Sequence, residues 1–236
     1  MQKERDMEKS KMELITGVSH DLKTPLTSII GYLELLRTES YQDQEEYNRF
    51  LQNSYNRAMH LKKLIDDLFE YTRLTTPNVQ LNLRAVDVYE LLEQMLVEFE
   101  PLAQEHHVSI IKKIGASPLL ATIDSNKFAR AIDNLLMNAL KYSEKPGDVS
   151  VSLKSDTHRL YIKVENRPPL TQEQELRIFE RFYKVDDSRS SEGIQTSSGL
   201  GLSIARNIIE LHGGTLRLNH NDGIYIFSIA VPLHCK

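Results

Sequence analysis

The sequence has a single cysteine and no long apolar run, and each of these features excludes a class of protein. Cys235 lies next to last, so neither an internal disulfide nor a cysteine-based metal cluster can form, which fits a reducing compartment. No stretch of about 18 apolar residues and no apolar segment behind a basic start is present, so neither a membrane span nor a signal peptide is expected. We expect a cytoplasmic chain, either complete in itself or the cytoplasmic part of a membrane-anchored protein.

Long runs of residues with the same charge are also missing from the chain. The 29 basic and 33 acidic residues give a net charge of −4 and form no long run of either sign. Nothing in this pattern indicates a polyanion-binding surface, so nucleic acid is not an expected partner. The 236 residues, 40% apolar and 26% charged, are typical of a globular protein with two modest domains.

Two long amphipathic helices are predicted at the start of the chain. Apolar residues recur at spacings of three and four from about residue 6 to 38 and again from about 44 to 74. Helices of roughly 30 residues are about 45 Å long and cannot bury their apolar faces in a lone hairpin. We therefore expect the hairpin to dimerise into a four-helix bundle.

The rest of the chain alternates between helical and strand patterns. Pro77 ends the helical periodicity and indicates a linker. The predicted helices are 87–105, 125–142, 171–182 and 199–212, and the predicted strands are 108–114, 119–123, 148–154, 159–165, 215–219 and 224–231. The fold class is α+β: a helical hairpin (1–76), a linker (77–85), and an α/β sandwich with helices on one face of a mixed sheet (86–236).

The first helix contains a candidate nucleophile. Residues 17–36 read GVSHDLKTPLTSIIGYLELL, so His20 and Thr24 share a helix face and the Asp21 carboxylate can turn toward the imidazole. A carboxylate bonded to one ring N–H raises the nucleophilicity of the other ring nitrogen. His20 is thus a candidate phosphoryl acceptor.

A later helix contains a strip of polar residues. The segment 133–143, DNLLMNALKYS, places Asn134, Asn138, Lys141 and Tyr142 at steps of four, three and one. Each position alone is typical of an ordinary surface helix. Together, carboxamide oxygens that suit Mg²⁺ and a nearby ammonium group indicate a phosphate and metal site.

A glycine pair precedes the last predicted helix. The segment 198–204 reads SGLGLSI, and Gly199 and Gly201 would let backbone N–H groups reach a phosphate at the helix N-terminus. Glycine pairs alone are weak evidence. This pair follows IFERFYKVD and a polar loop that ends at residue 198.

Taken in order, these segments resemble the sensor histidine kinases of two-component systems. SHDLKTPLTSI is similar to their H-box, 133–143 to their N-box, 178–184 to their F-box and SGLGLSI to their second glycine box, with a closer likeness to the vancomycin-resistance sensors. The resemblance implies a dimerising phosphotransfer bundle and a Bergerat-type ATPase domain. It implies an ATP-dependent protein-histidine kinase that passes the phosphoryl group to an aspartate of a response regulator, with phosphatase activity toward that regulator.

The resemblance also implies roles for single residues. His20 would be phosphorylated, Asp21 would act as general base and Thr24 would orient water for dephosphorylation of the regulator. Asn138 would bind Mg²⁺, Arg181 or Lys184 would touch the terminal phosphate, and 185–198 would form the ATP lid. The remaining nucleotide contacts would come from Asn134, Lys141, Tyr142, Gly199, Leu200, Gly201 and Leu202. The implied partners are a second copy of the chain and a receiver domain, and a membrane only through a sensor region upstream.

The first glycine box departs from the family pattern. Residues 164–170 read VENRPPL, which puts Asn166 where the family has an adenine-reading aspartate. A neutral acceptor makes a weaker hydrogen bond than a charged one, so we expect weaker ATP binding. Pro168 and Pro169 stiffen a loop that glycine makes flexible in the family.

Three alternatives stay open. The chain could serve mainly as a phosphatase of its regulator with vestigial ATP use, which a measured ATP affinity would reveal. It could be a dimeric scaffold with an inactive nucleotide fold, which Asn138, Lys141, Gly199 and Gly201 disfavour. It could be an ATPase of the same superfamily with another acceptor, which the His20 segment disfavours.

Overall fold

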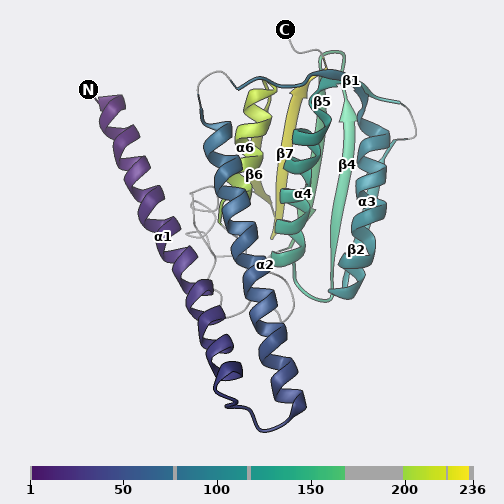
Figure 1. Cartoon of the computed structure of the whole chain (residues 1–236). Coiled ribbons are helices and arrows are strands. Elements are labelled where there is room, and N and C mark those ends of the chain that lie inside the picture. The colour runs from purple at the N-terminus through teal and green to yellow at the C-terminus, as the bar shows by residue number, and fades with distance from the viewer. Residues whose placement is uncertain (1, 77–78, 116–117, 168–198, 222, 234–236) are drawn as a thin grey trace. The chain divides into compact units, whose positions relative to one another are not determined.

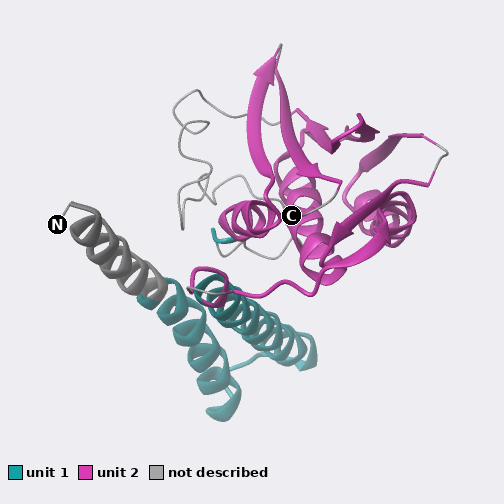
Figure 2. Ribbon diagram, turned by 90° about the horizontal axis from the view of Figure 1, so that it is seen from above, with its two compact units in different colours: residues 1–72, 181–184, 195–200 teal, residues 73–180, 185–194, 201–236 magenta. Residues whose placement is uncertain are grey.

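The computed structural model describes residues 2–76, 79–115, 118–167, 199–221 and 223–233, without the side chains of 2–18 and of His20. The chain divides into two compact units (Figure 2): residues 1–72 form most of the first, and residues 73–180 and 201–236 most of the second. Within the described residues, no helix combines the length and the apolar character needed to cross a membrane.

The first unit is a helical hairpin of α1 (Gln2–Arg37) and α2 (Gln44–Leu74), as Figure 1 shows. α1 continues through Pro25. α2 begins where the Asp43 carboxylate accepts a hydrogen bond from the Glu46 backbone N–H at 2.8 Å, an N-terminal cap. The rings of Tyr32 and Phe50 pack across the hairpin with centroids 5.8 Å apart. The predicted helices at 6–38 and 44–74 are confirmed.

The hairpin leaves large apolar side chains exposed in the single chain. Phe69 is 69% exposed and Ile30 is 58% exposed, in contrast to the fully buried core residues of the second unit. The other exposed large apolar residues of the two helices are Leu26, Leu33, Leu35, Leu51, Tyr55, Met59 and Ile65. Apolar surface on this scale is typical of an interaction face.

The second unit is built on a five-stranded sheet with the order β2-β4-β5-β7-β6, in which β2 and β4 are parallel and the other pairs antiparallel. The helices α3, α4 and α6 cover one face of this sheet (Figure 1). The bounds are α3 Val88–Glu105, β2 Val108–Ile114, α4 Ser125–Tyr142, β4 Gly147–Ser155, β5 Arg159–Asn166, α6 Gly201–Leu211, β6 Thr215–Asn221 and β7 Ile224–Pro232. The predicted mixed sheet with helices on one face is confirmed.

A second, two-stranded sheet joins β1 (Arg84–Asp87) to β3 (Leu120–Ile123). No strand was expected at Arg84, which lies inside the range 77–85 predicted as linker. β1 depends on antiparallel pairing with β3, more than thirty residues away, and four residues carry too little alternation to reveal it. The predicted helix at 171–182 lies outside the described residues.

Buried and exposed side chains alternate along β5, so the sheet has one face covered by helices and one open face. Leu160, Ile162 and Val164 are fully buried toward the helices, whereas Lys163 between them is exposed. α4 packs its apolar face onto the covered side through Phe128, Ile132, Leu135 and Leu136. Because these contacts fix α4, they also fix the polar strip on its other side.

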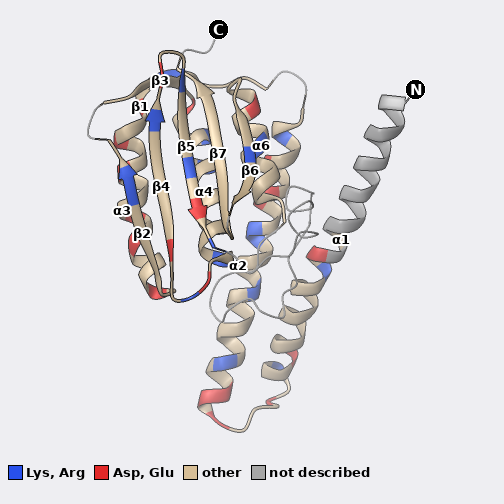
Figure 3. Cartoon of the chain, turned by 180° about the vertical axis from the view of Figure 1, so that it is seen from behind, with Lys and Arg blue, Asp and Glu red and all other residues tan. Residues whose placement is uncertain are grey.

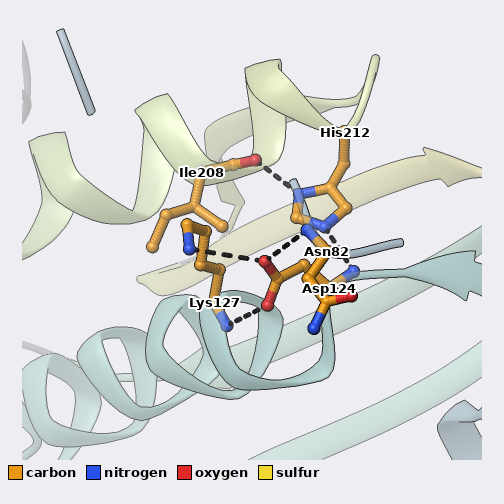
Figure 4. A network of polar contacts seen from close by, with 5 residues as sticks. All are labelled: Asn82, Asp124, Lys127, Ile208 and His212. Carbon is orange, nitrogen blue, oxygen red and sulfur yellow. Dashed lines mark hydrogen bonds and ion pairs between the residues drawn. The ribbon is translucent and has the colours of Figure 1, made fainter. Parts of the chain in front are cut away.

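A buried carboxylate joins three segments of the second unit (Figure 4). Asp124 Oδ1 caps α4 by accepting the Lys127 N–H at 3.1 Å, and Oδ2 accepts the Asn82 N–H at 3.0 Å and pairs with Lys127 Nζ at 3.3 Å. Although burial raises the pKa of Asp124, these hydrogen bonds and the ammonium group outweigh it, and the pKa lies below its usual value. Asp124 therefore fixes the point at which the chain enters the second unit.

The same network contains a fully buried histidine. The Asp124 N–H donates to His212 Nε2 at 3.0 Å, so Nδ1 carries the proton and donates to the Ile208 carbonyl at 2.7 Å. Burial lowers the pKa of His212 below 6.5 and keeps the ring neutral. A second proton on Nε2 would oppose the Asp124 N–H and break the link between α4 and α6.

We predict that this network makes the catalytic unit less stable in mild acid. Because the folded pKa of His212 is lowered, below about pH 6.5 the unfolded chain binds a proton that the folded chain does not, so the free energy of unfolding falls as pH falls. His212→Gln should lose about 1 to 3 kcal/mol at pH 8 and show a weaker pH dependence between 7 and 5. Denaturant unfolding across this range measures both, with the exposed His158→Gln as control, and an unchanged pH slope in His212→Gln would contradict the assignment.

Candidate phosphoacceptor and nucleotide sites

The proposed phosphoacceptor segment lies in α1. His20 is part of this helix, and its side chain lies outside what the structure describes. Asp21, the next residue, is half-buried, and Thr24, one turn later, is exposed. The hydroxyls of Thr27 and Ser28 donate to the carbonyls of Lys23 and Thr24, at 2.9 and 3.2 Å. Helical geometry therefore places Thr24 on the same face as His20, as the spacing predicts.

The polar strip of α4 lies at the border between core and surface. Asn134, Asn138 and Tyr142 are half-buried, while Lys141 is only 7% exposed. The Lys141 ammonium lies 5.0 Å from the centre of the Tyr142 ring, a cation–π contact that orients both side chains. α4 thus presents two carboxamides and one cation along one side, as the sequence predicts.

Asn134 is also in contact with the start of α6. A Cβ atom at Gly201 would lie 3.1 Å from Asn134 Oδ1, so only glycine leaves this approach unhindered. The Asn134 amide nitrogen is buried and has no hydrogen-bond partner among the described residues. Gly199, two residues before α6, has a φ of 71°, a conformation that glycine adopts without strain. The glycine pair is therefore needed for close approach and for a left-handed turn.

Asn166 ends β5 on the covered face of the sheet. It is 3% exposed, pairs with Tyr225 of β7 and has a buried Oδ1 with no partner in the described part of the chain. It lines a cavity of about 330 Å³ at the end of β5, together with Ser143 and Arg167 and with Lys113 and Glu165 of the open face. Glu165, the neighbouring residue, lies on the open face, where it pairs with Lys113 at 3.8 Å. Asn166, not Glu165, therefore shares the face of the helices.

These orphaned amide groups fit a nucleotide. A buried polar group without a partner costs free energy, and an adenine or phosphate would supply the missing acceptors and donors. In the described residues, no group of three or more His, Cys, Asp and Glu could hold a metal ion. A Mg²⁺ ion here would depend on the Asn138 oxygen, waters and phosphates, which is the coordination that Mg²⁺ prefers.

Several predicted site residues cannot be placed. Arg181, Lys184, the lid at 185–198 and the prolines 168 and 169 lie outside the described residues. The sequence analysis did not find Asp124 or His212, which position α4 and α6. An aspartate directly before a helical pattern is a cap signal and could have revealed Asp124, whereas the partner of His212 is 88 residues away and leaves no local signal.

Two family models match the chain. The first, His Kinase A (phospho-acceptor) domain, matches residues 10–77. The second, histidine kinase-, DNA gyrase B-, and HSP90-like ATPase, matches residues 123–234. His20 lies within the first match, and α4, Asn166 and the glycine pair lie within the second.

Comparisons with solved structures show the same fold. The Acinetobacter baumannii histidine kinase AdeS superposes with a TM-score of 0.73 at 22% identity, covering 91% of this chain and 98% of that one. Histidine kinase ThkA, solved in complex with response regulator protein TrrA, gives a TM-score of 0.77 at 21% identity and covers 98% of this chain and 64% of that one.

Curated relatives are more similar in sequence. Sensor protein VanSC of Enterococcus gallinarum is 35% identical over 97% of this chain and 62% of its own length. Sensor protein VanS of Enterococcus faecium is 34% identical over 95% of this chain and 58% of its own length, so the chain spans about three fifths of these relatives. With a phosphoacceptor domain followed by a kinase-type ATPase domain, and with VanS-type proteins this similar over nearly all its residues, the chain belongs to the sensor histidine kinases.

Proposed function

We propose that the chain phosphorylates its own His20 from Mg-ATP and passes the phosphoryl group to an aspartate of a response regulator. Residues 1–76 would form the phosphotransfer domain and 86–236 the catalytic domain. The observation that carries the proposal is the pair of orphaned carboxamide atoms, Asn134 Nδ2 and Asn166 Oδ1, in a unit that matches kinase-type ATPases. A folded domain that keeps such groups buried and unpaired is built to receive a polar ligand.

The proposed reaction transfers the terminal phosphoryl group of ATP to the imidazole of His20. A neutral imidazole nitrogen attacks the terminal phosphorus of ATP, the bond to the bridging oxygen breaks, and ADP leaves. The proton of the other ring nitrogen is held by Asp21, which stabilises the positive charge that develops on the ring. Most of the rate would come from positioning and charge neutralisation.

The catalytic unit would hold the nucleotide from several sides. Asn166 would accept a hydrogen bond from the adenine amino group, and Asn138 would hold the Mg²⁺ ion, which neutralises phosphate charge when bound. Lys141 adds a positive charge close to Asn138. The N-terminus of α6, with Gly199, Leu200, Gly201 and Leu202, would cradle phosphate oxygens, and Arg181 or Lys184 would meet the terminal phosphate.

Two protein partners are proposed. The exposed apolar side chains of the hairpin, Ile30 and Phe69 among them, support a second copy that completes a four-helix bundle. ThkA was solved in complex with a response regulator, which supports a receiver domain as the partner of this chain. By its resemblance to sensor proteins such as VanSC, we propose that the chain acts on the cytoplasmic side of a membrane-anchored sensor.

A second candidate function is favoured by Asn166. A neutral adenine acceptor weakens ATP binding, so phosphatase activity toward the regulator would then exceed kinase activity. Comparing the rates of His20 phosphorylation and of regulator dephosphorylation at cellular ATP concentrations separates the two.

His20→Gln should abolish autophosphorylation and leave ATP binding and dimerisation intact, because glutamine suits a helix but has no nucleophilic nitrogen. Incubation with γ-labelled ATP and Mg²⁺, followed by acid, measures this, since phosphohistidine is acid-labile. His106→Gln should keep full labelling. Label retained on His20→Gln would disprove the acceptor.

Thr24→Ala should leave labelling of His20 largely intact and slow dephosphorylation of the regulator by about tenfold or more, because a hydroxyl that orients water is not needed for attack by imidazole. The matched control is Thr27→Ala, which removes an exposed hydroxyl bonded only to the Lys23 carbonyl among the described atoms. Equal losses of both activities in Thr24→Ala would contradict this division of roles.

Asn166→Asp should have opposite effects on binding and on stability. A charged acceptor should tighten nucleotide binding by up to about tenfold. Without nucleotide, a carboxylate at a position that is 3% exposed should lower the melting temperature. Calorimetric titration with a non-hydrolysable ATP analogue and thermal unfolding measure the two effects, with Asn219→Asp on exposed β6 as control. Unchanged or weaker binding would show that Asn166 does not read the base.

A further inference from the structure

The open face of the sheet carries a row of cations that no sequence run reveals. Strand register places Lys113 of β2, Ser152 of β4 and Lys163 of β5 directly opposite one another, and the row continues through Ser228 of β7 to Arg217 of β6. Figure 3, seen from behind, shows blue Lys and Arg segments on several strands of this sheet. Residues paired in this way share a face, so cations and serines alternate across the sheet.

Three of the five residues in this row line a groove of about 310 Å³. The groove is lined by Lys113, Ser152, Lys154, Tyr161, Lys163 and Glu165. Because neighbouring strands are about 4.8 Å apart, Lys113 and Lys163 flank Ser152 at roughly 5 Å on either side. Lys154 follows Ser152 on the same face two residues along β4. Three ammonium groups can therefore reach a point above one serine hydroxyl.

The residue at the centre of the groove is largely buried. Ser152 is 9% exposed and has no hydrogen-bond partner among the described residues. Ser150, the preceding residue on this face, is also 9% exposed, and its hydroxyl is buried without a partner. Ser150 lines the neighbouring cavity and not this groove. Within the groove, the Ser152 hydroxyl can donate a hydrogen bond to a ligand with acceptor oxygens.

The described residues that line the groove include fewer acidic side chains than lysines. Lys113 has one distant partner, Glu165 at 3.8 Å, and within the described chain Lys154 and Lys163 form no ion pair. Three lysines against one glutamate make this groove positive in a chain whose net charge is −4. Like charges gathered at a site raise its free energy unless an anion neutralises them.

We propose that this groove binds a small phosphorylated molecule, with a phosphoryl group above Ser152 and between Lys113, Lys154 and Lys163. The cations are lysines, which bind phosphate as point charges, whereas planar carboxylates are matched by the arginine fork. A volume near 310 Å³ is at the small end of ligand sites. The site goes beyond the proposed kinase function.

The groove adjoins the cavity beside Asn166, because Lys113 and Glu165 line both, but its other lining residues lie on the open face of the sheet. Asn166 and α4 lie on the covered face of the sheet, whereas Lys163 and Glu165 point to the open face. No described residue of α4 or α6 lines the groove. A ligand in the groove would therefore not occupy the position proposed for ATP.

A titration with inorganic pyrophosphate tests the proposal. The whole isotope-labelled chain is used, and binding is monitored through the amide chemical shifts. We expect the amides of Lys113, Ser152 and Lys163 to shift along one saturable curve. Lys163→Gln and Ser152→Ala should each raise the dissociation constant obtained from that curve by about three- to tenfold. Any binding of pyrophosphate at the glycine pair would appear separately, at Gly201, with its own curve.

A neighbouring lysine provides the matched control. Lys112 precedes Lys113 in β2 but pairs with Glu93 of α3 at 3.5 Å, so Lys112→Gln removes the same charge outside the groove. An equal loss of pyrophosphate affinity in Lys112→Gln would show that only the overall charge matters, and it would overturn the proposed site. So would the absence of a saturable shift at Ser152, or shifts at Gly201 alone. Citrate binding as tight as pyrophosphate would overturn the phosphoryl assignment.

Discussion

The catalytic unit depends on one buried carboxylate. Asp124 caps α4, accepts the Asn82 N–H and, through its own backbone N–H, holds His212 at the end of α6. This junction adds directional hydrogen bonds to the apolar packing between α4 and α6, which by itself tolerates sliding. Because it fixes the two helices, the contact between Gly201 and Asn134 has a defined geometry. The proposed nucleotide site would thus be preorganised by residues that are not among its proposed nucleotide contacts.

Asn166 illustrates how the chemistry of the base site and the stability of the unit oppose each other. An aspartate, as the family has here, would bind adenine better but would leave a buried charge whenever the site is empty. Asparagine keeps the acceptor and removes most of that desolvation cost. If Asn166 reads the base as proposed, the change would suit a site that spends much of its time without nucleotide, and weaker ATP binding would be its consequence.

The sequence was most informative where a period repeats within one element. The hairpin helices, α4, α6 and the strands of the large sheet follow from spacings of three, four or two residues, and the N-box and glycine motifs lie on the elements expected for them. β1, by contrast, exists because Arg84 to Asp87 pair with β3, and His212 is buried because Asp124 lies beside it. Such features depend on contacts between distant residues, which no local pattern contains.

The charge pattern shows the same limit for surfaces. A search for basic runs along the chain detects only lysines that are adjacent in sequence, and by that measure the chain has no anion-binding surface. In a sheet, however, side chains on one face come from every second residue of each strand and from neighbouring strands. Lys113, Ser152 and Lys163 are widely separated in sequence but adjacent in register. Whether a sheet protein has a charged site is therefore decided by strand order and register, and not by its net charge.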